Sequence, residues 1–383
     1  KLATGDVFRG WMETIEIKTF ADVIKNEAEH SAKMAGRGTA NFEDQLRVAN
    51  ELIRGLEIII SGKNRKTIQN NLNCLQRELT NALETFASSI LEAERNLASA
   101  PDDQRKYAFN YLVGFLMSFA SRTGTRERLH IFTTNYDRYI EAGADVAGLR
   151  LIDRFVGMLA PIFRASRLDV DLHYNPPGIR GEPRYLEGVA YFTKLHGSID
   201  WVDCHKAIRR FGLSFGAKDI EPYLRAPGLD RANPMKLMIY PNSAKDRETA
   251  EYPYVELFRD FAVSICRPNS TLVTYGYSFG DEHINRVIED MLTIPSAHLV
   301  IISFSDPQGR IMKLYEKLGR PAQVTLLVGN HLGDLKALVD HYLPKPAIDR
   351  TSFRMAELLR MRFGTQKLEK QDDGDIDIGG KLP

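Results

Sequence analysis

Three short polar stretches in this sequence carry side chains that can do chemistry, and each one follows an apolar segment. They are Thr133-Thr134-Asn135-Tyr136-Asp137, His196-Gly197-Ser198 and Gly276-Tyr277-Ser278-Phe279-Gly280-Asp281. An imidazole titrates near neutral pH and can take a proton, whereas amide, hydroxyl and carboxylate groups bind and orient polar ligands. In an open parallel sheet, ligands bind beyond the carboxyl ends of the strands. We therefore expect the three stretches to meet in one crevice.

Each of these residues also has a purely structural interpretation. Asn135 and Asp137 are typical turn formers and helix caps. A histidine such as His196, at the end of a strand, is often a core residue whose ring bonds to the backbone. The combination of three such strand ends favours a functional site over three separate structural roles.

The third stretch also matches the G-x-S-x-G pattern of a nucleophile elbow, with a predicted strand before it and a helix after it. A serine hydrolase would use Ser278 as nucleophile, with Asp306 and His331 in the order that this fold requires. The bulky neighbours Tyr277 and Phe279 argue against this alternative, and so does the lack of an HGGG-type loop upstream.

The usual phosphate-binding loops are missing from the sequence. Neither a Walker A motif nor a G-x-G-x-x-G pattern after a strand is present. A nucleotide site would therefore depend on other loops.

The elements that must position these residues form a regular pattern in the second part of the chain. Apolar strands are predicted at 129–135, 187–195, 236–240, 271–276, 298–303 and 323–328. Helices are predicted from about Asp137 and over 252–266, 281–294, 308–319 and 331–343, with connections at 165–186 and 203–235. Strands that alternate with helices of this length indicate an α/β fold with a Rossmann-like parallel sheet.

The region before these strands reads as almost entirely helical. Apolar residues recur at helical spacing over 42–60, 65–100 and 103–121, and Pro101 separates the last two helices. We expect a helical insertion domain at 25–124, a sheet domain made of 1–24 plus 125–345, and a C-terminal extension at 346–383. The acidic tail at 365–383 is predicted to lie against a neighbouring subunit or partner.

Composition excludes several classes of protein. The 383 residues carry 51 Lys and Arg against 50 Asp and Glu, a net charge of +1, and 43% are hydrophobic. These values argue against a disordered chain and against a surface devoted wholly to nucleic acid. The three cysteines, Cys74, Cys204 and Cys266, are expected to be buried reduced thiols. Without an apolar run of about 18 residues, we expect a cytoplasmic protein that does not span a membrane.

The three strand ends together resemble the motifs of a sirtuin-type NAD-binding domain. The matching segments are TTNYD at 133–137, KLHGSIDW at 194–201 and YGYSFGDEHIN at 275–285. The version SFGDEHIN is similar to that of bacterial sirtuin-like effectors of anti-phage defence, in particular the subunits paired with a HerA-type ATPase. The resemblance covers about 125–345 and, more loosely, the helices before it.

This resemblance implies a role for each site residue. Asn135 and His196 would be catalytic. The residues that would bind NAD are Thr133, Thr134, Asp137, Gly276, Ser278, Phe279 and Asp281. NAD⁺ would be the substrate, cleaved to ADP-ribose and nicotinamide, and no zinc is expected because the four-cysteine module of deacylase sirtuins is absent. The family's glycine-rich G-A-G-x-S loop is expected just before Lys1.

The resemblance also implies partners, and it leaves alternatives open. The expected partners are a HerA-like hexameric ATPase, further copies of this chain, and DNA reached through that complex. The alternatives to NAD⁺ hydrolysis are NAD-dependent protein deacylation, serine hydrolysis at Ser278, and a non-catalytic or nuclease-associated scaffold subunit of the ATPase complex.

Overall fold

A computed structural model describes most of the chain, with gaps. The described residues are 19–34, 40, 42–60, 66–120, 128–165, 172–174, 184–185, 188–204, 207–229 and 252–345. The predicted strand at 236–240, most of the predicted segment 1–24 and the whole extension 346–383 lie outside them.

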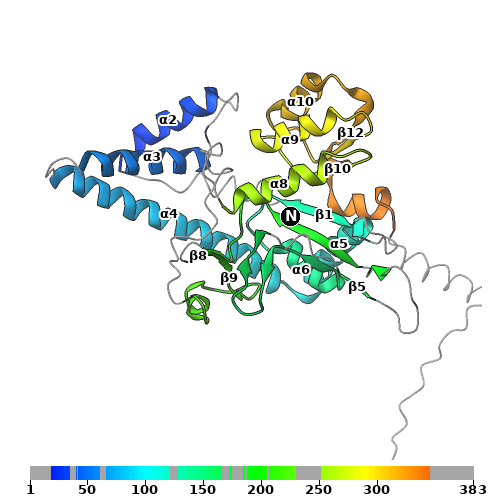
Figure 1. Cartoon of the computed structure of the whole chain (residues 1–383), viewed down its shortest axis with the longest axis horizontal. Coiled ribbons are helices and arrows are strands. Elements are labelled where there is room, and N and C mark those ends of the chain that lie inside the picture. The colour runs from blue at the N-terminus through cyan, green and yellow to red at the C-terminus, as the bar shows by residue number, and fades with distance from the viewer. Residues whose placement is uncertain are drawn as a thin grey trace, which may run out of the picture.

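The N-terminal region is helical, as predicted. Its elements are α2 (Ala21–Met34), α3 (Phe42–Ile60), α4 (Lys66–Ala98) and α5 (Asp102–Ala120). Helices α2, α3 and the first part of α4 lie side by side as an arm at the left of Figure 1. None of the described helices is both long and apolar enough to cross a membrane.

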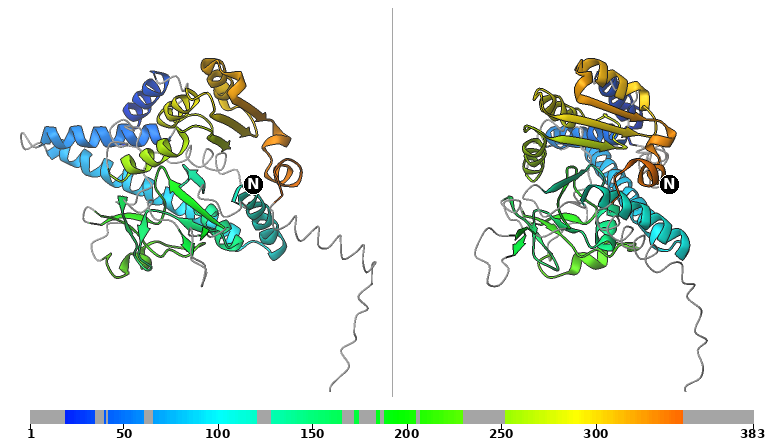
Figure 2. Two further views of the ribbon diagram at one scale, coloured as in Figure 1. Left: turned by 45° about the vertical axis from the view of Figure 1, so that its right-hand side comes forward. Right: turned by 90° about the vertical axis from the view of Figure 1, so that its right-hand side faces the viewer.

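Two parallel sheets carry the predicted strand ends. In the first sheet the order is β1 (Leu129–Thr133), β7 (Val189–Lys194) and β2 (Arg150–Ile152). In the second the order is β10 (Thr271–Tyr275), β11 (His298–Ser303) and β12 (Val324–Val328). Figure 2 shows the second sheet, in yellow and orange, above the first, in green. The expected parallel α/β architecture is confirmed, with the described strands divided between two sheets.

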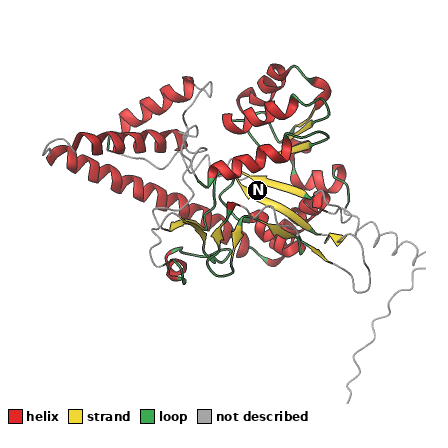
Figure 3. Cartoon of the chain, in the orientation of Figure 1, coloured by secondary structure: helices red, strands yellow, loops and turns green. Residues whose placement is uncertain are grey.

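Helices cover both sheets, as Figure 3 shows. Helix α6 (Tyr139–Ala147) follows β1, while α8 (Tyr254–Ile265), α9 (Glu282–Leu292) and α10 (Arg310–Leu318) accompany the second sheet. Apolar residues of α8, α9 and α10 pack with those of β11 and β12 in one buried cluster. Short 3₁₀ turns lie at Pro307–Gly309 and Pro321–Gln323.

The prediction of one continuous helix over 331–343 is wrong. The chain forms α11 (Asn330–Gly333), α12 (Leu335–Ala337) and a π-helical turn, η6 (Leu338–Tyr342). Asp334 interrupts the helix because its backbone is extended and its side chain accepts a hydrogen bond from the Ala337 N–H at 2.9 Å.

The prediction missed several short strands, and some of them lie in the regions 165–186 and 203–235, which are therefore not simple connections. A four-stranded antiparallel sheet has the order β3 (Phe155–Val156), β4 (Ile162–Phe163), β9 (Ala207–Arg210) and β8 (Trp201–Cys204). A two-stranded ribbon joins β5 (His173–Tyr174) to β6 (Arg184–Tyr185), and a 3₁₀ turn, η2, spans Glu221–Arg225. Strands of two to four residues are too short to show a period of two.

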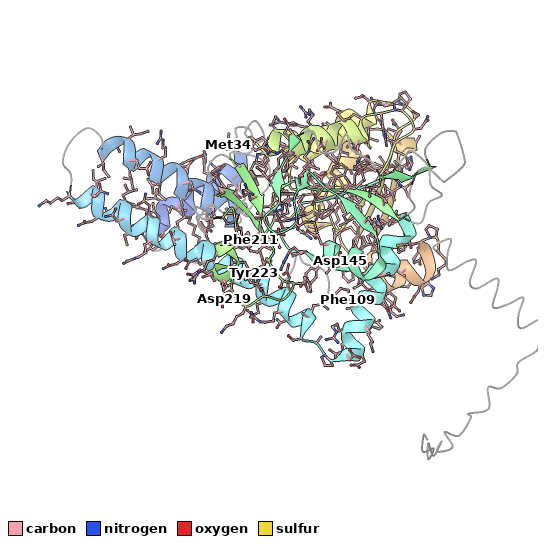
Figure 4. All side chains as sticks on the ribbon, turned by 60° about the horizontal axis from the view of Figure 1, so that its bottom comes forward. Met34, Phe109, Asp145, Phe211, Asp219 and Tyr223 are labelled. Carbon is pink, nitrogen blue, oxygen red and sulfur yellow. The ribbon has the colours of Figure 1, made fainter. Side chains whose placement is uncertain are left out.

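The helical arm and the strand-end loops share one core. Residues of α4 such as Phe86 and Ile90 belong to the same buried cluster as Tyr136, Ile199 and Phe211. Figure 4 shows Phe211 and Tyr223 beside α4. The predicted division at residues 24 and 124 stays a prediction, but α4 reaches from the arm to the loops that carry the candidate site.

The three cysteines are unpaired, as expected. Cys74, Cys204 and Cys266 are half-buried, however, rather than fully buried.

Candidate active site

The structure brings the second and third polar stretches together. His196 follows β7 and Asp281 lies between β10 and α9, and the His196 Nε2 lies 2.9 Å from the Asp281 Oδ2. The His196 side chain is 14% exposed and that of Asp281 is 6% exposed. Although the two atoms are close, Nε2 makes no aligned hydrogen bond to any residue that the structure describes. This contact is therefore a charge pair when the imidazole is protonated, and it joins the two parallel sheets.

The first stretch lies beside His196. The rings of Tyr136 and His196 are 6.5 Å apart, and the Tyr136 carbonyl accepts a hydrogen bond from the Ile199 N–H at 3.1 Å. Asn135 is exposed at the end of β1, and its N–H donates to the Thr133 Oγ1 at 3.1 Å. The end of β1 therefore presents the Asn135 side chain to solvent, while Tyr136 packs inward.

Asp137 is buried behind this edge rather than exposed on it. Its side chain is only 4% exposed, and its Oδ1 accepts a hydrogen bond from the Tyr139 N–H at 3.3 Å. Burial raises the pKa of Asp137, and the positive charge of Lys194 opposes that rise. Asp137 therefore forms a turn with Tyr139 at the start of α6, whose N-cap is Arg138, and its predicted contact with NAD stays a prediction.

Lys194 connects the ends of β1 and β7 from inside the protein. Its side chain is 2% exposed, and its ammonium group donates to the Asp137 carbonyl and lies 2.8 Å from the Glu141 Oε1. Burial raises the pKa of Glu141 as well, again opposed by Lys194. Lys194 is the first residue of the second motif, KLHGSIDW, but nothing in the sequence indicates its positioning role.

A buried ion pair anchors the same loop to α4. The Arg138 Nε lies 3.2 Å from the Glu94 Oε1, and the Arg138 backbone N–H donates to the same oxygen at 2.8 Å. The Arg138 guanidinium also donates to the carbonyls of Leu213 and Ser214. Glu94 is fully buried, and sequence reasoning missed it because a lone glutamate in a long helix reads as a surface residue.

The loop after β10 is held by its own hydrogen bonds. Gly276 and Phe279 adopt positive φ values of 65° and 52°. The Asn285 Nδ2 donates to the Phe279 carbonyl at 3.0 Å, and the Tyr277 hydroxyl lies 3.0 Å from the Asn285 Oδ1. Phe279 is 5% exposed, and its ring packs in the core. Phe279 can therefore contact a ligand only through its backbone groups.

The alternative catalytic triad does not assemble. The Asp306 carboxylate accepts hydrogen bonds from the N–H groups of Ile311 and Met312 at 2.8 and 3.2 Å, and the His331 ring packs against His341. No hydrogen bond or ion pair joins Ser278, Asp306 and His331 within the part of the chain that the structure describes. The positive φ also falls on Phe279 and not on the serine, where the strained turn of an elbow would place it.

Comparison with protein families identifies the domain that carries this site. The model of the SIR2-like domain matches residues 129–320, just over half of the 383 residues. The chain belongs to the SIR2-like family. The match begins at β1 and includes all three strand-end stretches, so the parallel sheets are the SIR2-like Rossmann-type fold. No curated protein matches the chain.

Membership of the SIR2-like family implies NAD binding and indicates an NAD-using enzyme. The donor set at the carboxyl ends suits such a ligand, because it combines the exposed amide of Asn135, the buried Nε2 of His196 and the hydroxyl of Ser278. Among the described residues of this SIR2-like protein, no group of three or more His, Cys, Asp or Glu side chains is placed to hold a metal ion.

Proposed function

We propose that this SIR2-like protein hydrolyses NAD⁺ to ADP-ribose and nicotinamide. The observation that supports this most is the contact of His196 with Asp281 beside the exposed Asn135, at the carboxyl ends of parallel strands in a SIR2-like domain. A proton acceptor, a carboxylate that stabilises its charged form, and an exposed amide are the groups that such a reaction needs.

The reaction requires little acid catalysis. When the bond between ribose and nicotinamide breaks, its electron pair stays on the ring nitrogen and neutralises the positive charge of the pyridinium. The ribose carbon becomes electron-poor, as in glycoside cleavage, and a water molecule adds to it. That water loses one proton, so the protein must orient the water and accept the proton.

The described residues can divide these tasks. In this proposal Asn135 orients the water and the ribose hydroxyls through its side-chain amide. His196 takes the proton, and the Asp281 carboxylate, 2.9 Å from its Nε2, stabilises the resulting imidazolium. The inward bonds of Lys194 and Arg138 hold these loops without occupying the exposed edge.

The direct experiment measures nicotinamide release from NAD⁺ by the full-length protein. We expect Asn135→Ala and His196→Ala each to lower the rate by about 100-fold or more, since these groups act on the reacting atoms. His298→Ala is the matched control, because His298 is the first residue of β11 and so lies at the amino end of the strand, away from the carboxyl ends that carry the candidate site. Nicotinamide release that survives both substitutions would contradict the proposal.

The products separate this proposal from its alternatives. A deacylase would form O-acyl-ADP-ribose from an acylated peptide, whereas a hydrolase forms free ADP-ribose without any peptide. Covalent labelling of Ser278 by a fluorophosphonate would support the serine hydrolase instead.

The proposal extends to an effector role in anti-phage defence with a HerA-type hexameric ATPase. The similarity of residues 275–285 to defence-associated sirtuin-like subunits supports this partner. We expect the two proteins to copurify, this chain to form a homo-oligomer, and nicotinamide release to change when the ATPase is added. Light scattering and the same NAD⁺ assay, with and without the ATPase, test these expectations.

A further inference from the structure

The backbone pairing of β1 with β7 ends just before the two candidate catalytic residues. The last aligned pair is Thr133 with Lys194, and one further hydrogen bond runs from the Leu195 N–H to the Thr133 carbonyl at 2.9 Å. Asn135 and His196 both lie beyond this point. The pairing of the two strands therefore does not by itself fix the distance between the loops that follow them.

Other contacts hold the two loops together beyond the strands. The Tyr136 carbonyl accepts the Ile199 N–H at 3.1 Å. The Lys194 ammonium group donates to the Asp137 carbonyl. Because Lys194 stands two residues before His196 in the chain, its side chain connects one catalytic loop to the other.

Glu141 on α6 holds the ammonium group in this position. The Glu141 Oε1 lies 2.8 Å from the Lys194 Nζ, and the Lys194 side chain is 2% exposed. The second carboxylate oxygen, Oε2, is buried and makes no hydrogen bond to the residues that the structure describes. The removal of two charges from water costs free energy that an incompletely bonded pair does not return, and an apolar pair of similar size is often as stable. Stability alone therefore does not account for this pair.

We infer that the Lys194–Glu141 pair is a clasp that sets the distance between Asn135 and His196, and that it keeps the reaction fast without stabilising the fold. Lys194 is a positioning residue, because it contacts the loops and not the reacting atoms. The inference rests on the proposed function, since it concerns the rate at which bound NAD⁺ is hydrolysed. The clasp should therefore govern kcat and leave KM unchanged.

Comparison of Lys194→Met with Lys194→Met/Glu141→Leu in the full-length protein tests the inference. The single variant leaves the Glu141 charge without its partner, so the melting temperature should fall, and removal of that charge in the double variant should restore it. Both variants lack the bond to the Asp137 carbonyl. We expect kcat for nicotinamide release to stay about 10- to 100-fold below wild type in both, because a misplacement of about 1 Å can have that effect. KM should change by less than about twofold.

A pair that only stabilises the fold would give a different result. In that case kcat would recover in the double variant together with the melting temperature, and this recovery would overturn the inference. Wild-type kcat in Lys194→Met would overturn it as well, and so would a double variant no more stable than the single one.

The exposed pair of Lys317 and Glu289 provides the matched control. It joins α10 to α9 at 2.6 Å, and Lys317 lies in the last turn of α10, which precedes the amino end of β12. Since this pair lies away from the carboxyl ends of the strands, Lys317→Met/Glu289→Leu should leave kcat within about twofold of wild type. A loss of kcat as large as that in Lys194→Met would overturn the inference, because the effect would then not be specific to the clasp.

Amide hydrogen exchange separates this inference from the proposed function. Exchange at residues 134–137 and 196–199 should be about tenfold or more faster in Lys194→Met/Glu141→Leu than in wild type, whether or not NAD⁺ is hydrolysed. If NAD⁺ is not hydrolysed but these amides exchange faster, the proposed activity is wrong and the clasp between the loops stands. If NAD⁺ is hydrolysed while kcat and exchange in the double variant are those of wild type, the clasp is wrong and the activity stands.

Discussion

His196 and Asp281 come from loops that are far apart in the chain, and their 2.9 Å contact joins two sheets. The substitution Asp281→Asn should separate the electrostatic effect of Asp281 on His196 from its role as the cap of α9. Asparagine caps a helix about as well as aspartate, so the bond from the His283 N–H can be kept while the charge is lost. We expect the rate of nicotinamide release to fall by about tenfold or more, because the imidazolium loses its counter-charge.

Thermal unfolding provides the control for this variant. The melting temperature of Asp281→Asn should stay close to that of the wild type if the cap is kept. An unchanged rate in a folded Asp281→Asn protein would show that the carboxylate does not assist His196.

At the residue scale, sequence located the candidate site residues but not the residues that hold them in place. Asn135, His196 and Ser278 belong to contiguous motifs and follow strands, so a pattern can find them. Glu94 belongs to no motif, and its role depends on which distant loop it meets in the fold. Asp137 and Phe279 belong to motifs yet point inward, because a motif fixes residue types and not the direction of each side chain.

Among the elements, helix α4 is fastened to the site loop by the Glu94–Arg138 pair. Glu94→Gln would leave the Arg138 charge buried without its partner charge, and we expect the free energy of unfolding to fall by about 3 kcal/mol. Glu51→Gln is the matched control, since Glu51 is 57% exposed and lies 3.2 Å from Arg47. That change should cost less than about 1 kcal/mol. Urea unfolding of both variants measures the difference, and equal losses would contradict the buried-pair argument.

The contact of α11 with β11 depends on the absence of a side chain at Gly333. A Cβ there would lie 2.2 Å from the Phe304 backbone nitrogen, which cannot move aside as a flexible side chain can. Gly333→Ala should therefore lower the free energy of unfolding by about 2 to 4 kcal/mol.

Gly55 in α3 offers the opposite case for the same substitution. Apart from its chain neighbours and the backbone of its own helix, no atom lies within 4 Å of a Cβ at Gly55, so Gly55→Ala should stabilise the helix by about 0.5 to 1 kcal/mol. Chemical denaturation of the two variants gives the comparison, and a shift in the same direction would refute the packing explanation.

Among the elements, the sequence predicted the boundaries well where the apolar pattern is regular, in the long helices and in strand β11. The predicted ranges for α3, α4 and β11 agree with the structure to within two residues at each end. The prediction failed after β12, where the Asp334 cap interrupts a helical pattern, and in the antiparallel sheet, whose strands are too short for periodicity. After β12 a local hydrogen bond of Asp334 determines the structure, and in the antiparallel sheet the pairing of strands that are distant in the sequence determines it.

For the whole molecule, positive and negative charges nearly balance, so buried groups have a large share in the pH dependence of stability. His130 on β1 is such a group: burial lowers its pKa from 6.5 to about 4, with Arg267 contributing a smaller repulsion. Its Nδ1 lies 3.0 Å from the Ser264 Oγ, which ties β1 to α8. The neutral ring is therefore the form that the folded protein favours.

The sign of the resulting pH dependence follows from proton binding. Below pH 6.5 the unfolded chain binds a proton at His130, whereas the folded protein does not do so until about pH 4, so acidification favours unfolding. Between pH 7 and pH 5 this one residue should cost about 2 kcal/mol of stability. His130→Gln should lose that slope while keeping a polar partner for Ser264. Urea unfolding at pH 7, 6 and 5 measures both proteins, and because Asp137 and Glu141 are common to both, their opposite contributions cancel in the difference. Parallel slopes for the two proteins would mean that His130 is not held neutral in the fold.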